Sequence, residues 1–264
     1  MKDRELGSHM SLLSTAKKLI STLQIIILFH SCVTKAFEAN WKLREGIREA
    51  LIKHYIIPDV MAVAPGNLAT VMYSSFAVNM GNKVDPRICQ HMPSVWWPSE
   101  EGCHYALLMI DCDVPSRRNP QYRARQHWVV VNIPRVDIYQ GKTLTEYIGP
   151  ITPRNSGLHR NVFVVFKQKE LLTTDEPFIS LINRGPNTRT RFSVRNFSAK
   201  YKLSDPIAVN FFRVGYPIYK DKEMRHSWVR NNRTSFTRYD FVPDWSVSPK
   251  TSTVEDFESK DSDE

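Results

Sequence analysis

Alternating runs of apolar and polar residues predict a chain built mainly from β-strands. Six short apolar runs are bounded by glycine, proline and asparagine, which are typical of turns. The runs around Val129 and Val164 are continuously apolar, as expected for strands that are buried on both faces. The predicted strands cover residues 68–73, 94–97, 105–110, 128–133, 162–168 and 207–214.

Helical spacing of apolar residues is found in two other segments. Leu43, Ile47 and Leu51 are four residues apart, which predicts a helix over residues 42–54. Phe197 and Tyr201 are also four apart, and they predict a second helix over residues 192–203.

The N-terminal segment has the pattern of a secretory signal peptide. Residues 11–36 contain no acid, and Lys17 and Lys18 precede an apolar run from residue 19 to 33 that ends near the small residue Ala36. This run is shorter than the roughly 20 residues that span a bilayer comfortably. We therefore expect residues 1–36 to be a cleaved signal peptide, with a buried helix or an uncleaved anchor as alternatives. Residues 7–10 (Gly-Ser-His-Met) resemble the remnant of a purification tag.

Composition and charge divide the rest of the chain. A hydrophobic share of 42% and a charged share of 24% are ordinary for a soluble domain, which we place at residues 37–244. Residues 245–264 are rich in serine, threonine and acids and are expected to be a disordered acidic tail. Residues 184–238 contain 13 Lys and Arg but three acids. This basic stretch suits a solvated face or contact with anionic lipid, heparin-like polymers or nucleic acid. Its irregular spacing favours the solvated face, so nucleic acid is not an expected partner.

The candidate chemistry lies where three predicted strands end or begin. Asp111 follows the strand at residues 105–110, and His127 and His159 each precede an apolar run. Three strands that each carry an ionisable residue at one end predict a single convergent site. Two histidines and a carboxylate suit a small anion that also carries hydrogen-bond donors. A nearby carboxylate favours protonated imidazole, so we expect both histidines to donate to phosphate as imidazolium.

These residues belong to longer blocks that resemble the phosphatidylethanolamine-binding protein family, which includes the Raf kinase inhibitor protein. The resemblance covers roughly residues 40–220. It implies an antiparallel Greek-key β-sandwich with peripheral helices. It also implies a site for phosphate-bearing ligands such as phosphoethanolamine, formed by Asp111, His127, Pro153 and His159, with Asp113, Pro115 and Ser116 shaping the adjacent turn. The matching blocks are residues 111–117, 126–134, 156–160 and 205–212.

Two residues depart from the pattern of the family. Arg125 stands where the family usually has a tryptophan, and Asn161 stands where it usually has a tyrosine. The loss of two aromatic walls should lower the affinity for a lipid head group. Arg125 adds a bidentate phosphate donor, so we include it in the ligand site and expect altered selectivity.

The function expected from these features is non-enzymatic binding of a phospholipid head group or a similar small molecule, without a metal or cofactor and with possible peripheral membrane contact. One alternative is a kinase or serine protease inhibitor that acts through a protein surface. Another is a hydrolase or metal-dependent enzyme that uses Asp111, His127 and His159. No serine or cysteine stands in a recognisable nucleophile turn, although Cys112 is adjacent to Asp111.

Export would change the meaning of several residues. We expect a secreted protein, with a cytoplasmic one as the alternative. Asn196 and Asn232 lie in glycosylation sequons, which matter only on the secretory route. Cys89 and Cys103 flank the strand at residues 94–97, and they can pair if their Cα atoms lie within about 7 Å.

Overall fold

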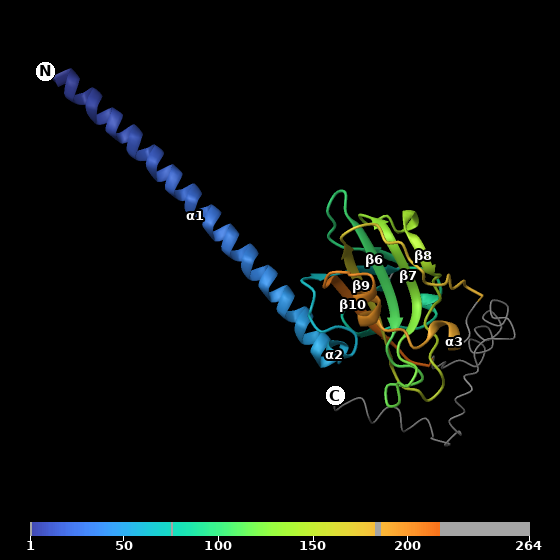
Figure 1. Cartoon of the computed structure of the whole chain (residues 1–264). Helices are drawn as coiled ribbons and strands as arrows, with labels where there is room; N and C mark the ends of the chain where they lie inside the picture. The colour runs from blue at the N-terminus through green and yellow to red at the C-terminus, as the bar shows by residue number, and fades with distance from the viewer. Residues whose placement is uncertain (1, 75, 183–185, 217–264) are drawn as a thin grey trace, which may run out of the picture.

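The computed structural model describes residues 2–74, 76–182 and 186–216. A long helix runs into a body made of two β-sheets, with short helices at its edge (Figure 1). The predicted tail at residues 245–264 and the sequon at Asn232 lie outside the described residues. The helical segments are α1 (Lys2–Lys53), α2 (Ile56–Asp59), η1 (Ile88–Gln90), η2 (Ile138–Gln140), α3 (Pro186–Arg189) and α4 (Val194–Lys200).

Five of the six predicted strands are present as single strands, and four of them are longer than predicted, whereas the segment 68–73 is divided into two short strands that belong to different sheets. The strands are β1 (Asn67–Leu68), β2 (Thr70–Tyr73), β3 (Phe76–Ala77), β4 (Asn82–Lys83), β5 (Ser94–Trp96), β6 (His104–Asp111), β7 (Arg125–Pro134), β8 (Lys142–Thr145), β9 (His159–Gln168) and β10 (Pro206–Val214).

Both predicted helices are also present. The helix expected at residues 42–54 is the last part of α1, and α4 lies inside the segment 192–203. Helix α1 passes without a break through residue 36, so cleavage there stays a prediction. Among the described helices, none carries an apolar stretch long enough to cross a membrane.

The large sheet is mixed, which corrects the expectation of a purely antiparallel fold. Its strand order is β1-β10-β9-β6-β7-β8, and β4 also pairs with β10. The four pairings from β10 to β8 are antiparallel, whereas β1 and β4 run parallel to β10. The mainly β class is thus confirmed, while the Greek-key order stays a prediction. Apolar patterns identify strands but do not fix the direction in which segments distant in sequence pair.

Two apolar cores cover the two faces of the large sheet. One core fills the space between the large sheet and the small sheet β3-β2-β5, and it contains Trp97, Tyr105 and Phe163. The other lies on the opposite face and includes Leu51 of α1 and Phe197 of α4. Strands β7 and β9 are therefore buried on both faces over most of their length, as their continuous apolar runs predict, and β6 is buried on both faces as well.

The cysteine pair raised by the sequence is not joined in the structure. Cys89 and Cys103 are both free thiols. Cys89 is buried in the core between the two sheets, and Cys103 packs against that core from its edge.

Candidate functional site

The predicted site residues meet at the end of the large sheet where β6 finishes and β7 and β9 begin. Asp111 is the register partner of Arg125 on β7 and of Asn161 on β9. Direct partners on neighbouring strands share a face, so these three side chains form a row. His159 precedes Asn161 by two residues and therefore lies on the same face. His127 is close enough for its charge to influence the pKa of Asp111.

Asp111 and His159 form a buried ion pair. Nδ1 of His159 donates to Oδ2 of Asp111 over 2.7 Å, and the backbone N–H of Asp113 donates to Oδ1 over 2.8 Å. Burial lowers the pKa of His159, but the charge and hydrogen bond of Asp111 outweigh burial and raise that pKa above its usual value. Burial raises the pKa of Asp111, and His159 more than reverses this effect, so the pKa is lowered. Both shifts favour the carboxylate–imidazolium form of the pair.

The other nitrogen of His159 is held by the loop before β9. Nε2 of His159 lies 2.9 Å from Oγ of Ser156, and the Ser156 hydroxyl donates to the carbonyl of Pro153 over 2.7 Å. Imidazolium donates from both nitrogens, so a continuous chain of donors runs from His159 through Ser156 to Pro153. Pro153 thus enters the site through its carbonyl oxygen.

This chain has the residue order of a Ser-His-Asp triad but different proton positions. In a triad the serine hydroxyl donates to a neutral histidine, which then acts as the base. Here the raised pKa of His159 favours the protonated ring, and the Ser156 hydroxyl donates to Pro153. The geometry therefore gives Ser156 no base in this protonation state.

His127 differs from the imidazolium expected for it. Nδ1 of His127 donates to the carbonyl of Ile148 over 2.9 Å. Burial, followed by the charge of Arg125, lowers the pKa of His127 to about 4. The ring is therefore neutral near pH 7, and Nε2 carries a lone pair. Within the described residues this buried nitrogen has no hydrogen-bond partner.

Asn161 supplies a second unmet acceptor to the same face. Its side chain is fully buried, and its amide nitrogen donates to the carbonyl of His159 over 3.3 Å. Its oxygen Oδ1 lacks a hydrogen-bond partner among the described residues. Arg125, opposite Asp111, is 3% exposed. We call Asp111, Arg125, His127, His159 and Asn161 the His127 cluster.

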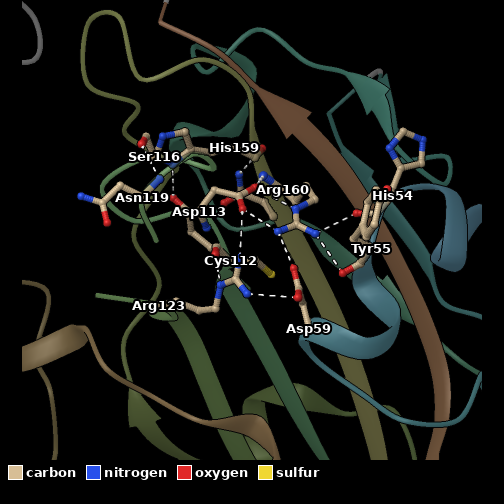
Figure 2. A network of polar contacts seen from close by, with 12 residues as sticks. His54, Tyr55, Asp59, Cys112, Asp113, Ser116, Asn119, Arg123, His159 and Arg160 are labelled. Atoms are coloured by element: carbon tan, nitrogen blue, oxygen red, sulfur yellow. Dashed lines mark hydrogen bonds and ion pairs between the residues drawn. The ribbon is translucent and has the colours of Figure 1, made fainter. Parts of the chain in front are cut away.

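A second ionic network starts at Asp113, whose carboxylate binds Arg160 (Figure 2). The carboxylate of Asp113 accepts hydrogen bonds from Nε and Nη2 of Arg160 at 2.8 and 2.6 Å. It also accepts one from the backbone N–H of Arg160 at 2.8 Å. Nη2 also donates to Asp59 over 2.9 Å. These contacts raise the pKa of Arg160 despite its burial.

The remaining nitrogen of Arg160 holds the end of α1. Nη1 donates to the carbonyls of His54 and Tyr55 at 2.7 and 2.9 Å. All five N–H donors of this guanidinium therefore have acceptors. Cations at the C-terminus of a helix also stabilise its exposed carbonyls. We call Asp59, Asp113, Arg123 and Arg160 the Arg160 network.

The turn after β6 holds the other residues that the sequence singled out. The backbone N–H of Asn119 approaches both the hydroxyl and the carbonyl of Ser116 at 3.2 Å, as expected for a turn-shaping serine. Pro115 follows a cis peptide bond in the same turn. Arg123 donates through Nε to the carbonyl of Cys112 over 2.8 Å and pairs with Asp59 at 3.1 Å.

Neither a reactive thiol nor a metal cluster accompanies these residues. Burial raises the pKa of Cys112 well above its usual range, and the residue packs in the core on the opposite face from Asp111. In the part of the chain that the structure covers, no three His, Cys, Asp or Glu side chains are grouped to hold a metal ion.

Comparisons with known proteins agree with this architecture. A protein of Drosophila melanogaster, "Putative odorant-binding protein A5", is 29% identical over 207 residues, which are 78% of this chain and 96% of the relative. A phosphatidylethanolamine-binding protein from Plasmodium vivax has 26% identity and a TM-score of 0.54, covering 64% of this chain and 97% of its own. A carboxypeptidase Y inhibitor, solved with its cognate proteinase, has 24% identity and a TM-score of 0.57. The match covers 66% of this chain and 97% of the inhibitor.

The family model described as "Phosphatidylethanolamine-binding protein" matches residues 63–212, more than half of the 264 residues. The chain belongs to the phosphatidylethanolamine-binding protein family.

Several contacts in and around this site were missed by sequence reasoning. The sequence shows Arg160 only as the last residue of the block 156–160, and its partner Asp59 lies 101 residues away in the chain. The Ile148 carbonyl that fixes the His127 ring carries no side-chain signal at all. The position of Arg160, directly after His159 and thus on the other face of β9, was the one available sign of a second network.

Proposed function

We propose that this protein is a non-enzymatic binding protein whose His127 cluster takes a small phosphate-bearing ligand that also carries an amine, such as a phosphoethanolamine head group. The observation that carries the proposal is the neutral His127 ring, whose buried Nε2 lacks a partner in the described chain. A buried polar atom without a hydrogen bond costs free energy, and a ligand that donates to it recovers that cost.

The charge balance of the cluster favours an anion. His159 as imidazolium and Arg125 as guanidinium carry two positive charges against the single carboxylate of Asp111. All three side chains are almost fully buried, where charges act on one another with little screening. The excess positive charge suits the phosphate of the ligand.

The acceptors of the cluster favour an amine on the same ligand. Nε2 of His127 and Oδ1 of Asn161 both require a donor. An ammonium group supplies up to three. Inorganic phosphate at neutral pH offers fewer donors, so phosphoethanolamine should bind more tightly than phosphate alone.

Calorimetric titration of phosphoethanolamine into the full chain tests this function. His127→Ala removes the unmet acceptor and should weaken binding about tenfold, the loss of one charge-assisted hydrogen bond. His91→Ala is the matched control, because His91 is exposed and lies outside the cluster. Equal affinity in all three proteins would overturn the proposal.

The hydrolytic alternative has its own test. Because Ser156 donates to Pro153 and the raised pKa of His159 disfavours the neutral ring that would act as a base, we expect a fluorophosphonate probe to leave Ser156 unlabelled at pH 7. Labelling that is lost in Ser156→Ala would make the protein an enzyme. The likeness to the carboxypeptidase Y inhibitor establishes the fold only, so protease or kinase inhibition stays a prediction from the resemblance.

We propose that the protein is exported, with residues 1–36 removed. The proposal is supported by the acid-free segment that ends at Ala36, and Asn196 in its sequon is exposed on α4. N-terminal sequencing of the protein secreted by a eukaryotic host should begin near Phe37. Retention in the cell with residues 1–36 intact would contradict export.

A further inference from the structure

Two neighbouring cavities lie on the face of the large sheet opposite to the His127 cluster. Their volumes are about 250 and 380 Å³, and Val60, Val194 and Arg195 line both of them. Val60 and Val194 belong to the core that covers this opposite face. The two cavities therefore adjoin each other beside α4, and we call them together the α4 groove.

The floor of the α4 groove is apolar. Met61, Phe166 and Val194 line the larger cavity and are each buried, and Leu203 adds a half-buried side chain. A cavity of about 150 Å³ lined by apolar side chains already admits benzene. The 380 Å³ of the larger cavity therefore has room for an alkyl chain of several carbons.

The rim of the larger cavity is cationic. Lys169, Arg195 and Lys202 line it together with one acid, Asp205. Arg195 donates a hydrogen bond to the carbonyl of Pro58. This acceptor is uncharged, so the bond does not neutralise the guanidinium.

The two lysines differ from other lysines of the body. Lys167 pairs with Glu100, and Lys200 pairs with Asp175 and Glu176. By contrast, the amines of Lys169 and Lys202 make neither an ion pair nor a hydrogen bond with any described residue. Two uncompensated ammonium groups therefore border one apolar cavity.

The end of α4 fixes the backbone that carries Lys202. Lys202 has a left-handed backbone conformation, with φ of 50°, and the N–H of Lys202 donates to the carbonyl of Ala199 over 3.2 Å. The next N–H, of Leu203, donates to the carbonyl of Ser198 over 2.9 Å. This pair of bonds closes the helix in the manner of a C-terminal cap, which positions Lys202 at the groove.

We propose that the α4 groove binds a small amphiphilic anion, an unbranched alkyl chain that ends in a carboxylate. The alkyl chain lies on the apolar floor, and the carboxylate lies between Lys169 and Lys202. Burial of the chain supplies most of the affinity, and the two ammonium groups select the anion over an uncharged head. This site is independent of the phosphate site, because the two occupy opposite faces of the sheet.

Calorimetry of the full chain with octanoate and with octan-1-ol tests the proposal. Octanoate should bind more tightly than octan-1-ol. Lys169→Gln with Lys202→Gln should weaken octanoate about fivefold, the sum of two exposed charge contacts, and leave octan-1-ol unchanged. Lys42→Gln with Lys142→Gln removes two exposed charges elsewhere and should change neither affinity.

Several outcomes would overturn the proposal. These are equal binding of octanoate and octan-1-ol, an unchanged octanoate affinity in the lysine variant, or amide resonances of α4 that octanoate leaves unshifted in the wild type.

A further outcome concerns the acidic residues 249–264. If octanoate binds only after Glu255→Gln, Asp256→Asn and Glu258→Gln, the tail of the chain occupies the groove and the assignment to a free amphiphile is wrong.

Discussion

Two buried ionic clusters lie on either side of β9, and two consecutive residues of this strand belong to one cluster each. His159 enters the His127 cluster, and Arg160 enters the Arg160 network on the opposite face. In the Arg160 network all five guanidinium donors meet protein acceptors. In the His127 cluster two buried acceptors, on His127 and Asn161, remain without partners in the described chain.

This difference supports a structural role for the Arg160 network and the binding role that we propose for the His127 cluster. A buried charge that is fully hydrogen-bonded is stable where it is, and its loss leaves other charges unpaired. A buried acceptor without a donor costs free energy until something binds to it. On this proposal, similar residue types hold the fold on one face of the sheet and form a ligand site on the other.

The largest expected effect follows from removing Arg160. Arg160→Met leaves Asp113 fully buried without its main cation, so the free energy of unfolding should fall by about 3–5 kcal/mol. Urea unfolding measures this change. Arg87→Met is the control, because Arg87 pairs with Asp85 at the surface and its loss should cost less than about 1 kcal/mol. Similar losses in both variants would contradict a structural role for the Arg160 network.

The pH dependence of stability should reveal His127. Its pKa is about 4 in the folded chain, compared with roughly 6.5 in the unfolded chain. As the pH falls below 6.5, the unfolded state binds this proton first, so the free energy of unfolding should drop by up to about 3 kcal/mol by pH 4. The raised pKa of His159 acts oppositely, since its contribution is present below about pH 6.5 and is lost as the pH rises through the folded value.

Urea unfolding between pH 4 and 7.5 measures the His127 effect. The His127→Gln variant should lack the part of the decline that His127 causes, because glutamine does not titrate, while His54, whose pKa burial also lowers to about 4, keeps its own contribution in both proteins. A decline of the same size in wild type and variant would show that His127 is not the group responsible.

Asp111→Asn should have a somewhat smaller effect on stability and a clear effect on His159. Loss of the charge-assisted hydrogen bond should cost about 2 kcal/mol. Without the carboxylate, burial dominates and the pKa of His159 should fall below its usual value. NMR titration of the His159 ring reads this pKa directly, and an unchanged pKa would show that Asp111 does not control it.

Ser156→Ala should produce the smallest effect, in the direction of tighter binding. A ligand that reaches Nε2 of His159 must displace the Ser156 hydroxyl, so its removal should strengthen phosphoethanolamine binding two- to threefold, about half a kcal/mol. Ser116→Ala removes a hydroxyl from the neighbouring turn and is the matched control. Weaker binding in Ser156→Ala would mean that the hydroxyl itself contacts the ligand.

The sequence predicted most of the strands, and the convergence of the candidate site residues, better than the pairing and protonation that connect them. Apolar runs located β6, β7 and β9, and ionisable residues at the strand ends located Asp111, His127 and His159. The parallel pairing of β1 and β4 with β10 was missed, because pairing direction depends on contacts distant in sequence. The neutral state of His127 was missed as well, because it depends on burial and on the backbone carbonyl of Ile148.

The central claim, that neutral His127 offers an acceptor to a ligand amine, is tested most directly by ¹⁵N NMR of its ring during titration with phosphoethanolamine at pH 7. We predict that Nε2 remains unprotonated and that its resonance shifts as it accepts a hydrogen bond, while Nδ1 keeps its proton for Ile148. Inorganic phosphate should cause a smaller shift. A ring that is protonated at both nitrogens, or an Nε2 resonance that phosphoethanolamine leaves unchanged, would contradict the account.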